Sequence, residues 1–197
     1  MAIEEIDQLS RMDLQKQLAF AYLCAKRFFP NYLFFSNNYN FGVPGVLRSG
    51  IDLLYNSIFN KTPSSQALEG LIQEIEANSP RPDDFATFYA SIAMYSAGVV
   101  YESVSLQTLT DIQRRLMDIS TMCTDAVDLF IQERDDMDYN EEGFEEKILN
   151  DPLMQEELGI QIGSIGYLKN SKEITESDIA ILLELQKEGT GILKIIQ

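Results

Sequence analysis

The sequence predicts an all-α fold: a single domain, residues 1–197, built as a bundle of about seven helices. Apolar residues recur at spacings of three and four through most of the chain, which is the pattern of amphipathic helices. No stretch shows the sustained alternation of apolar and polar residues that marks a half-buried strand. A chain of 197 residues with 45% hydrophobic content fits one domain with an ordinary core.

The first half of the chain shows three helices. Helical periodicity covers residues 12–29, and Pro30 is expected to end that helix because proline removes a backbone donor and clashes with the preceding turn. Pro44 suits the first position of a second helix. Residues 62–65 predict the start of a third, shorter helix that ends near Asn78.

A strongly apolar helix is expected over residues 83–102. Thr110 and Gln113 match a capping box, in which two side chains satisfy free backbone N–H groups, and predict a helix that ends near Arg134.

The C-terminal third begins with a charged loop at residues 135–142, inside an acidic loop segment that spans about residues 135–150. Asp151, followed by Pro152, has the features of a cap and first helical position. Thr175 is expected to cap the last helix and Gly189 to end it.

Charge is unevenly distributed along the chain. Residues 125–157 carry −11 of the net charge of −16. Nucleic acid is not an expected ligand, because phosphate binding depends on Lys and Arg. An anionic membrane surface would likewise be repelled. The charge favours a basic protein partner or cations, and it also serves solubility.

We expect a cytoplasmic protein. Cys24 and Cys123 form no C-x-x-C pattern, which fits buried thiols in a reducing compartment. The N-terminus is acidic where a signal peptide is basic. The longest uncharged stretch, residues 85–101, is short and polar for a membrane span.

The sequence offers few means of catalysis, and we expect no catalytic residue, cofactor or metal. Histidine is absent, so the Ser-His-Asp and Cys-His mechanisms lack their base. Asp138, Asn140 and Glu142 resemble the start of a calcium loop, but Leu149 stands where the bidentate Glu is required.

A weaker pattern concerns magnesium. Glu141, Glu142 and Glu145, followed by Glu173 and Glu176, resemble the carboxylate pattern of all-α nucleotide pyrophosphohydrolases. That chemistry requires the two groups to face each other across a Mg²⁺ ion.

Seven of the twenty aromatic residues lie in residues 28–41, a stretch without charge that we interpret as a long connection. It would form a satellite core beneath the loop. Alternatively, Tyr32 and Phe35 would be anchors at a homodimer contact or a partner pocket.

Several blocks together resemble the YjaG-like bacterial family of proteins of unknown function (number 416). In chain order these blocks are residues 23–32 (L-C-A-K-R-F-F-P-N-Y), Phe41 and Gly42, Arg48, residues 51–53, residues 82–85, residues 150–152, residues 155–157, and Glu188 with Gly189. The resemblance spans nearly the whole chain. It implies a compact, all-helical cytoplasmic protein and no particular reaction.

The chain departs from that family pattern at three places: Lys26 replaces a Glu, Ala93 an Asp, and Tyr55 a Trp. A polar site built on those acids would therefore be lost or specialised in this member. Asn31, Arg48 and Asp52 remain as a possible polar set, and we interpret them as hydrogen bonds and ion pairs that join the first two helices.

The leading functional hypothesis is a non-enzymatic binding protein that presents an acidic surface to a basic protein partner, for example an immunity-type inhibitor of a toxin. Its predicted contact residues are Asp135, Asp136, Asp138, Glu141 and Glu142, with Tyr32 and Phe35 as a second contact zone. The alternatives are a carboxylate–Mg²⁺ enzyme acting on nucleotides and a homo-oligomeric housekeeping protein.

Overall fold

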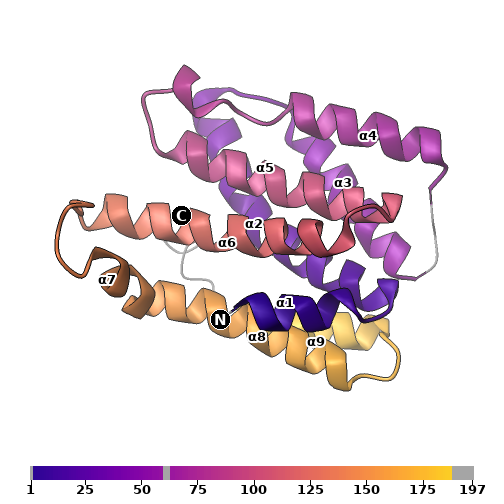
Figure 1. Cartoon of the computed structure of the whole chain (residues 1–197). Helices are drawn as coiled ribbons and strands as arrows, with labels where there is room; N and C mark the ends of the chain where they lie inside the picture. Colours follow the sequence, from indigo (N-terminus) through magenta and orange to yellow (C-terminus); the bar gives the residue numbers. More distant parts are fainter. Residues whose placement is uncertain (1, 60–62, 188–197) are drawn as a thin grey trace.

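The chain folds into α-helices packed in two layers (Figure 1). The computed structural model describes residues 2–59 and 63–187. Within these residues there is no strand and there are nine α-helices, two more than predicted. They are α1 (Ala2–Ser10), α2 (Leu14–Tyr39), α3 (Pro44–Ile58), α4 (Ser65–Ala77), α5 (Tyr89–Ser105), α6 (Ile112–Arg134), α7 (Phe144–Asn150), α8 (Pro152–Asn170) and α9 (Glu176–Lys187).

One layer contains α2 to α6 and the other α1 and α7 to α9, with α1 lying along both α6 and α8 (Figure 1). Within the first layer α5 is central, since it contacts α2, α3, α4 and α6. Its side chains are buried around most of its circumference, which is why the sequence shows an almost uniformly apolar segment there. No helix in the described part of the chain is long and apolar enough to cross a membrane.

The prediction that Pro30 ends a helix was wrong, because α2 continues through it to Tyr39. Proline costs the helix a hydrogen bond, but the residues on both sides of it bury large aromatic side chains. Phe28 and Phe29 precede the proline, Tyr32 and Phe35 follow it, and none of the four is more than 8% exposed. The uncharged stretch 28–41 is therefore mostly helix and core rather than a long connection.

Other helix ends follow local chemistry as predicted. Pro44 begins α3. Ser64 caps α4 by accepting a hydrogen bond from the Ala67 N–H. Asp151 caps α8 by accepting one from the Leu153 N–H, with Pro152 at the first helical position. The predicted end signal at Gly189 lies outside the described residues.

Three further boundaries differ from prediction. The helix expected from residue 83 begins at Tyr89, after the short 3₁₀ turn Pro82–Asp84. The capping box does not form, because Asp111 precedes α6 in the left-handed region and the Thr110 hydroxyl is within hydrogen-bonding distance of the Thr108 hydroxyl. Part of the acidic loop segment forms α7, whose Ile148 is buried.

The turn between α2 and α3 depends on a glycine. Gly42 has φ of +64°, and a Cβ built there would lie 2.2 Å from the Tyr32 hydroxyl oxygen. That hydroxyl donates to the Asn78 carbonyl at 2.8 Å, which ties α2 to the end of α4. The turn therefore needs both a left-handed conformation and the absence of a side chain.

Gly42→Ala should lower the free energy of unfolding by about 1–3 kcal/mol more than Gly143→Ala does. Gly143 also has positive φ, but its Cβ would meet nothing within 4 Å, so it controls for backbone strain alone. Urea denaturation measures both variants. Equal losses would show that the contact with Tyr32 has no cost.

Candidate functional site

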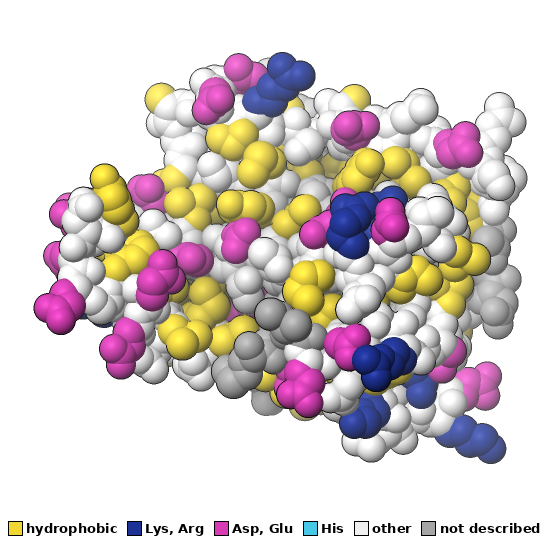
Figure 2. All heavy atoms as spheres, viewed as in Figure 1, with side chains coloured by type: hydrophobic (Ala, Val, Ile, Leu, Met, Phe, Trp, Pro, Cys, Tyr) yellow, Lys and Arg dark blue, Asp and Glu magenta, His cyan; other side chains and the backbone are white. Residues whose placement is uncertain are grey.

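The predicted acidic contact residues cluster at one end of the molecule, where α6 ends and α7 turns the chain into α8 (Figures 1 and 2). We call residues 133–151 the acidic end. It contains nine acidic residues against Arg134 and Lys147, which gives −7 of the total charge of −16. Eight of the nine are exposed: Glu133, Asp135, Asp136, Asp138, Glu141, Glu142, Glu145 and Glu146.

Two internal cations hold the acidic end together. Arg134 binds Asp135 at 2.6 Å and Asp151 at 2.6 Å, so it joins the end of α6 to the cap of α8. Lys147 on α7 pairs with Glu141 in the loop. Of the eight exposed carboxylates, only Asp135 and Glu141 have a cationic partner among the described residues. The remaining six present uncompensated negative charge to solvent.

Asp138 organises the loop itself. Its carboxylate accepts hydrogen bonds from the backbone N–H of Asn140 at 2.9 Å and from the side-chain amide of the same residue at 2.8 Å. These two bonds favour the ionised form and lower the pKa of Asp138. The loop is therefore a defined turn rather than an extended charged strand.

The carboxylates surround a hollow with a volume of about 290 Å³. Its lining residues are Ile131, Asp135, Asp136, Met137, Glu141, Lys147 and Asp151. The partly exposed side chain of Met137 thus lies beside four carboxylates and one ammonium group, whereas Ile131 is only 1% exposed. This combination suits a long cationic side chain, which has an aliphatic stem and a charged head.

Tyr139 is a residue that the sequence reasoning missed. It lies between Asp138 and Asn140, and 77% of its surface is exposed. An aromatic residue is unusual in a solvated turn. The position of this tyrosine within the charged loop could therefore have marked it as a contact residue from the sequence. Exposed tyrosines of this kind often anchor protein partners.

The structure does not bring together the carboxylates of the magnesium pattern. Glu141, Glu142 and Glu145 precede α8, whereas Glu173 and Glu176 follow it (Figure 1). A helix of 19 residues separates the two groups by about 28 Å. Across the described residues, no three Asp, Glu or Cys side chains lie close enough to hold a metal ion.

The prediction that Tyr32 and Phe35 form an exposed contact zone was wrong. Tyr32 and Phe35 are both 0% exposed, because they pack on the inner face of α2. Phe35 contacts the rings of Phe41 and Phe85 with centroids 5.8 Å and 4.9 Å away. These side chains belong to the core and are not available to a partner or a second copy.

The polar set joining the first two helices is also not as predicted. Asn31 is buried, whereas Arg48 and Asp52 are exposed on α3, and no hydrogen bond or ion pair connects the three within the described chain. Arg48 instead places its guanidinium over the ring of Phe29, 5.5 Å from the centroid. The contact between α2 and α3 at this point is cation–π in character.

A buried polar network joins α2, α6 and α8. Arg27 donates to Glu157 at 2.7 Å, and their side chains are only 7% and 5% exposed. Glu157 accepts from Gln161 at 2.7 Å, and Gln161 accepts from Ser120 at 2.5 Å. Burial alone lowers the pKa of Arg27, but the Glu157 carboxylate contributes in the opposite direction and the net pKa is raised. The Arg27 guanidinium is therefore charged in the fold.

The two cysteines meet beside this network. Cys24 and Cys123 are both buried, and Cys24 lies close enough to Cys123 to influence its thiol. Burial raises the pKa of the Cys123 thiol well above its ordinary value, the contact with Cys24 raises it further, and Arg27 only partly offsets these effects. Both residues are free thiols in the fold, as the sequence predicted.

Glu157→Leu should lower the free energy of unfolding by about 3–5 kcal/mol, because it leaves the Arg27 charge buried and unpaired. Arg27→Met together with Glu157→Leu should recover most of that loss. Arg114→Met is the matched control, since its ion pair with Asp118 is exposed and should contribute no more than about 1 kcal/mol. Urea denaturation distinguishes these outcomes, and a Glu157→Leu loss as small as that of the control would contradict the assignment.

The raised pKa of Cys123 should make the protein less stable at alkaline pH. The Cys123 thiol has a higher pKa in the folded protein than in the unfolded chain. Its contribution to the free energy of unfolding is therefore complete below the unfolded pKa, about 8.5, and is lost as the pH rises above that value. Denaturation at pH 7.5 and 9.5 should show this decline, and Cys123→Ala should reduce it. Parallel declines in the two proteins would show that another group is responsible.

Comparison with known proteins identifies a family. The family model described as "Protein of unknown function (DUF416)" matches residues 4–191. A solved structure of a DUF416 family protein from Shewanella baltica OS155 has the same fold, with a TM-score of 0.80, 24% sequence identity, and coverage of 93% of this chain and 94% of that one. No curated protein matches this sequence. The chain belongs to the DUF416 family of proteins of unknown function, as its sequence motifs indicated.

Proposed function

We propose that this protein is a binding module whose acidic end docks a basic protein partner. The observation that supports this proposal is the hollow at the acidic end, which is lined by four carboxylates and by Met137. A lysine or arginine of the partner would lay its stem against Met137, which is partly exposed. Its charged head would then reach Asp136, which has no cationic partner among the described residues.

The rest of the acidic end supports the same function. Six uncompensated carboxylates at one end of the molecule attract a basic partner from a distance and orient it, which raises the rate of association. Tyr139 supplies a large exposed aromatic surface in the middle of that charge. Charge would therefore set the association rate and orientation, while the hollow and Tyr139 contribute the close contacts.

Internal ion pairs keep this surface in place before a partner arrives. Arg134 fixes Asp135 and Asp151, and Lys147 fixes Glu141. Ordered carboxylates lose less conformational entropy on binding than free ones do. This favours recognition of a folded partner with a matching pattern of positive charge over loose attraction of cations.

Reversal of three charges tests the proposal. Asp136→Lys, Asp138→Lys and Glu142→Lys together should abolish capture of the partner from lysate at low salt. The matched control is Glu69→Lys, Glu74→Lys and Glu76→Lys on α4, three exposed residues with the same change in net charge. The control should still capture the partner that the unmodified protein captures.

The captured protein then permits a quantitative measurement. Its association rate should fall steeply with salt for the unmodified protein and for the α4 control, and the dependence should flatten for the acidic-end variant. Equal capture by all three proteins, or an identical salt dependence, would show that the acidic end is not the contact surface.

A further inference from the structure

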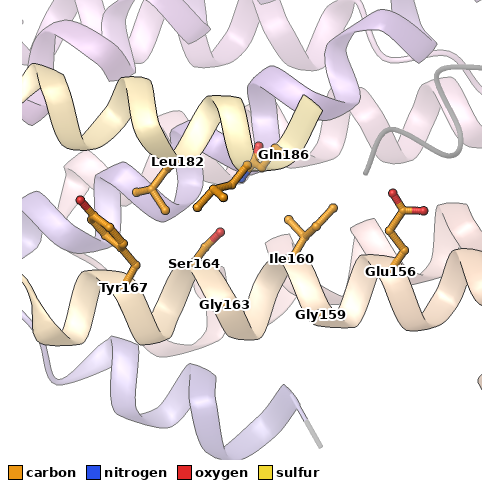
Figure 3. Close-up of a pocket in the computed structure, with 9 residues that line it drawn as sticks. Glu156, Gly159, Ile160, Gly163, Ser164, Tyr167, Leu182 and Gln186 are labelled. Carbon is orange, nitrogen blue, oxygen red and sulfur yellow. The ribbon is translucent and has the colours of Figure 1, made fainter. Parts of the chain in front are cut away.

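A second hollow lies between α8 and α9 and shares no residue with the acidic end (Figure 3). Its volume is about 320 Å³, at the lower end of the roughly 300–1,000 Å³ typical of pockets that hold small molecules. Its lining comes from residues 156–167 of α8 and residues 182–186 of α9. We call this hollow the α8–α9 pocket.

Apolar groups form most of the pocket wall. Ile160 lines it from α8, and Leu182 and Leu185 line it from α9. Gly159 and Gly163 leave the backbone of α8 bare at the pocket, since a Cβ built on either would meet no described atom within 4 Å. Both glycines are exposed, so the pocket is open to solvent on this side. The wall can therefore hold the apolar body of a small molecule.

Two buried polar side chains in the pocket have no hydrogen-bond partner among the described residues. Ser164 on α8 and Gln186 on α9 both line the pocket, and each is only 6% exposed. In Figure 3 the Ser164 hydroxyl points away from its own helix toward α9. Most buried hydroxyl and amide groups in folded proteins are hydrogen-bonded. Two unpartnered groups in one hollow therefore point to a ligand that supplies their bonds.

The other polar side chains of the pocket are already engaged. The Tyr167 hydroxyl donates to Asp178 at 2.5 Å, and Glu156 has an interaction of its own. No lysine or arginine in the described chain lines the pocket. A ligand therefore finds hydrogen-bonding groups here but no available charge, which favours a neutral molecule. The net charge of −16 further disfavours an anion.

We propose that the α8–α9 pocket binds a small neutral molecule with an apolar body and a polar end, such as an alkyl amide. The body lies against Ile160, Leu182 and Leu185, and the polar end reaches Ser164 and Gln186. A hydroxyl and a carboxamide each offer a donor and an acceptor, so an amide of the ligand can pair with either. This site does not rest on the function proposed for the acidic end.

Titration of the isotope-labelled protein with hexanamide, followed by two-dimensional NMR, tests this proposal. The backbone signals of Gly159 and Gly163 and the side-chain amide signal of Gln186 should shift and reach saturation. Hexanoate has the same chain with a carboxylate in place of the amide, and should shift these signals little at equal concentration. No saturable shift with hexanamide, or equal shifts with hexanoate, would overturn the proposed ligand class. Shifts of the same signals on dilution of the protein alone would assign the pocket to a second copy.

A variant that fills the pocket tests the location of the site. Gly163→Leu should abolish hexanamide binding, because its side chain would occupy the space over the bare backbone. Gly166→Leu is the matched control: it lies on the same helix and its Cβ would also meet nothing within 4 Å, but it does not line the pocket. The control should bind hexanamide as the unmodified protein does. Equal binding by the two variants would place hexanamide elsewhere and overturn the site.

Removal of the two polar groups tests their role and does not depend on Gly163→Leu folding. Ser164→Ala and Gln186→Leu each remove one hydrogen bond to hexanamide and should weaken its binding by up to about tenfold. Neither variant should be easier to unfold in urea, because neither group has a partner among the described residues. Unchanged affinity for hexanamide in both variants would show that the polar pair does not bind the ligand, and would overturn the proposal.

Discussion

The pairing of one buried charge with another decides how the two layers of this protein meet. Arg27 lies on α2 in the first layer and Glu157 on α8 in the second, and both are excluded from solvent. A guanidinium in that position is tolerated only when a carboxylate pairs with it. The position of α8 is therefore constrained to one that brings Glu157 to Arg27, with Gln161 and Ser120 completing the network. Helix α7 packs against α8 and the end of α6, whereas α9 packs against α2.

Much of the fold could be predicted from the sequence because its signals are local. Pro44, Ser64 and Asp151 fix helix starts by chemistry within a few residues, and the structure agrees at each. Pro30 carries an equally strong local signal, yet tertiary packing overrides it, since ending α2 there would expose Tyr32 and Phe35. Similarly, α7 is a short helix in a highly charged segment, and burial of Ile148 stabilises it in a way that periodicity could not reveal.

The charge of the candidate site could be predicted from the sequence, but its ion pairs and its hollow could not. Composition showed where the acidic residues cluster, but not that Arg134 would join Asp135 to Asp151, or that Met137 would lie beside them in one hollow. Those relations depend on where α6 ends relative to α8. The Arg27–Glu157 pair and the contact between Cys24 and Cys123 were equally inaccessible, because each joins positions about a hundred or more residues apart.

The separation of Arg27 and Glu157 along the chain also affects how the protein can fold while it is being synthesised. The partners are 130 residues apart in the chain. At the usual synthesis rate of about 5–20 residues per second, roughly 7–26 seconds pass between their additions to the growing chain. During that interval the newly made helices of the first layer lack the carboxylate that permits the guanidinium to leave water. The nascent chain can therefore collapse only partially, and completion of the core awaits translation of the C-terminal third.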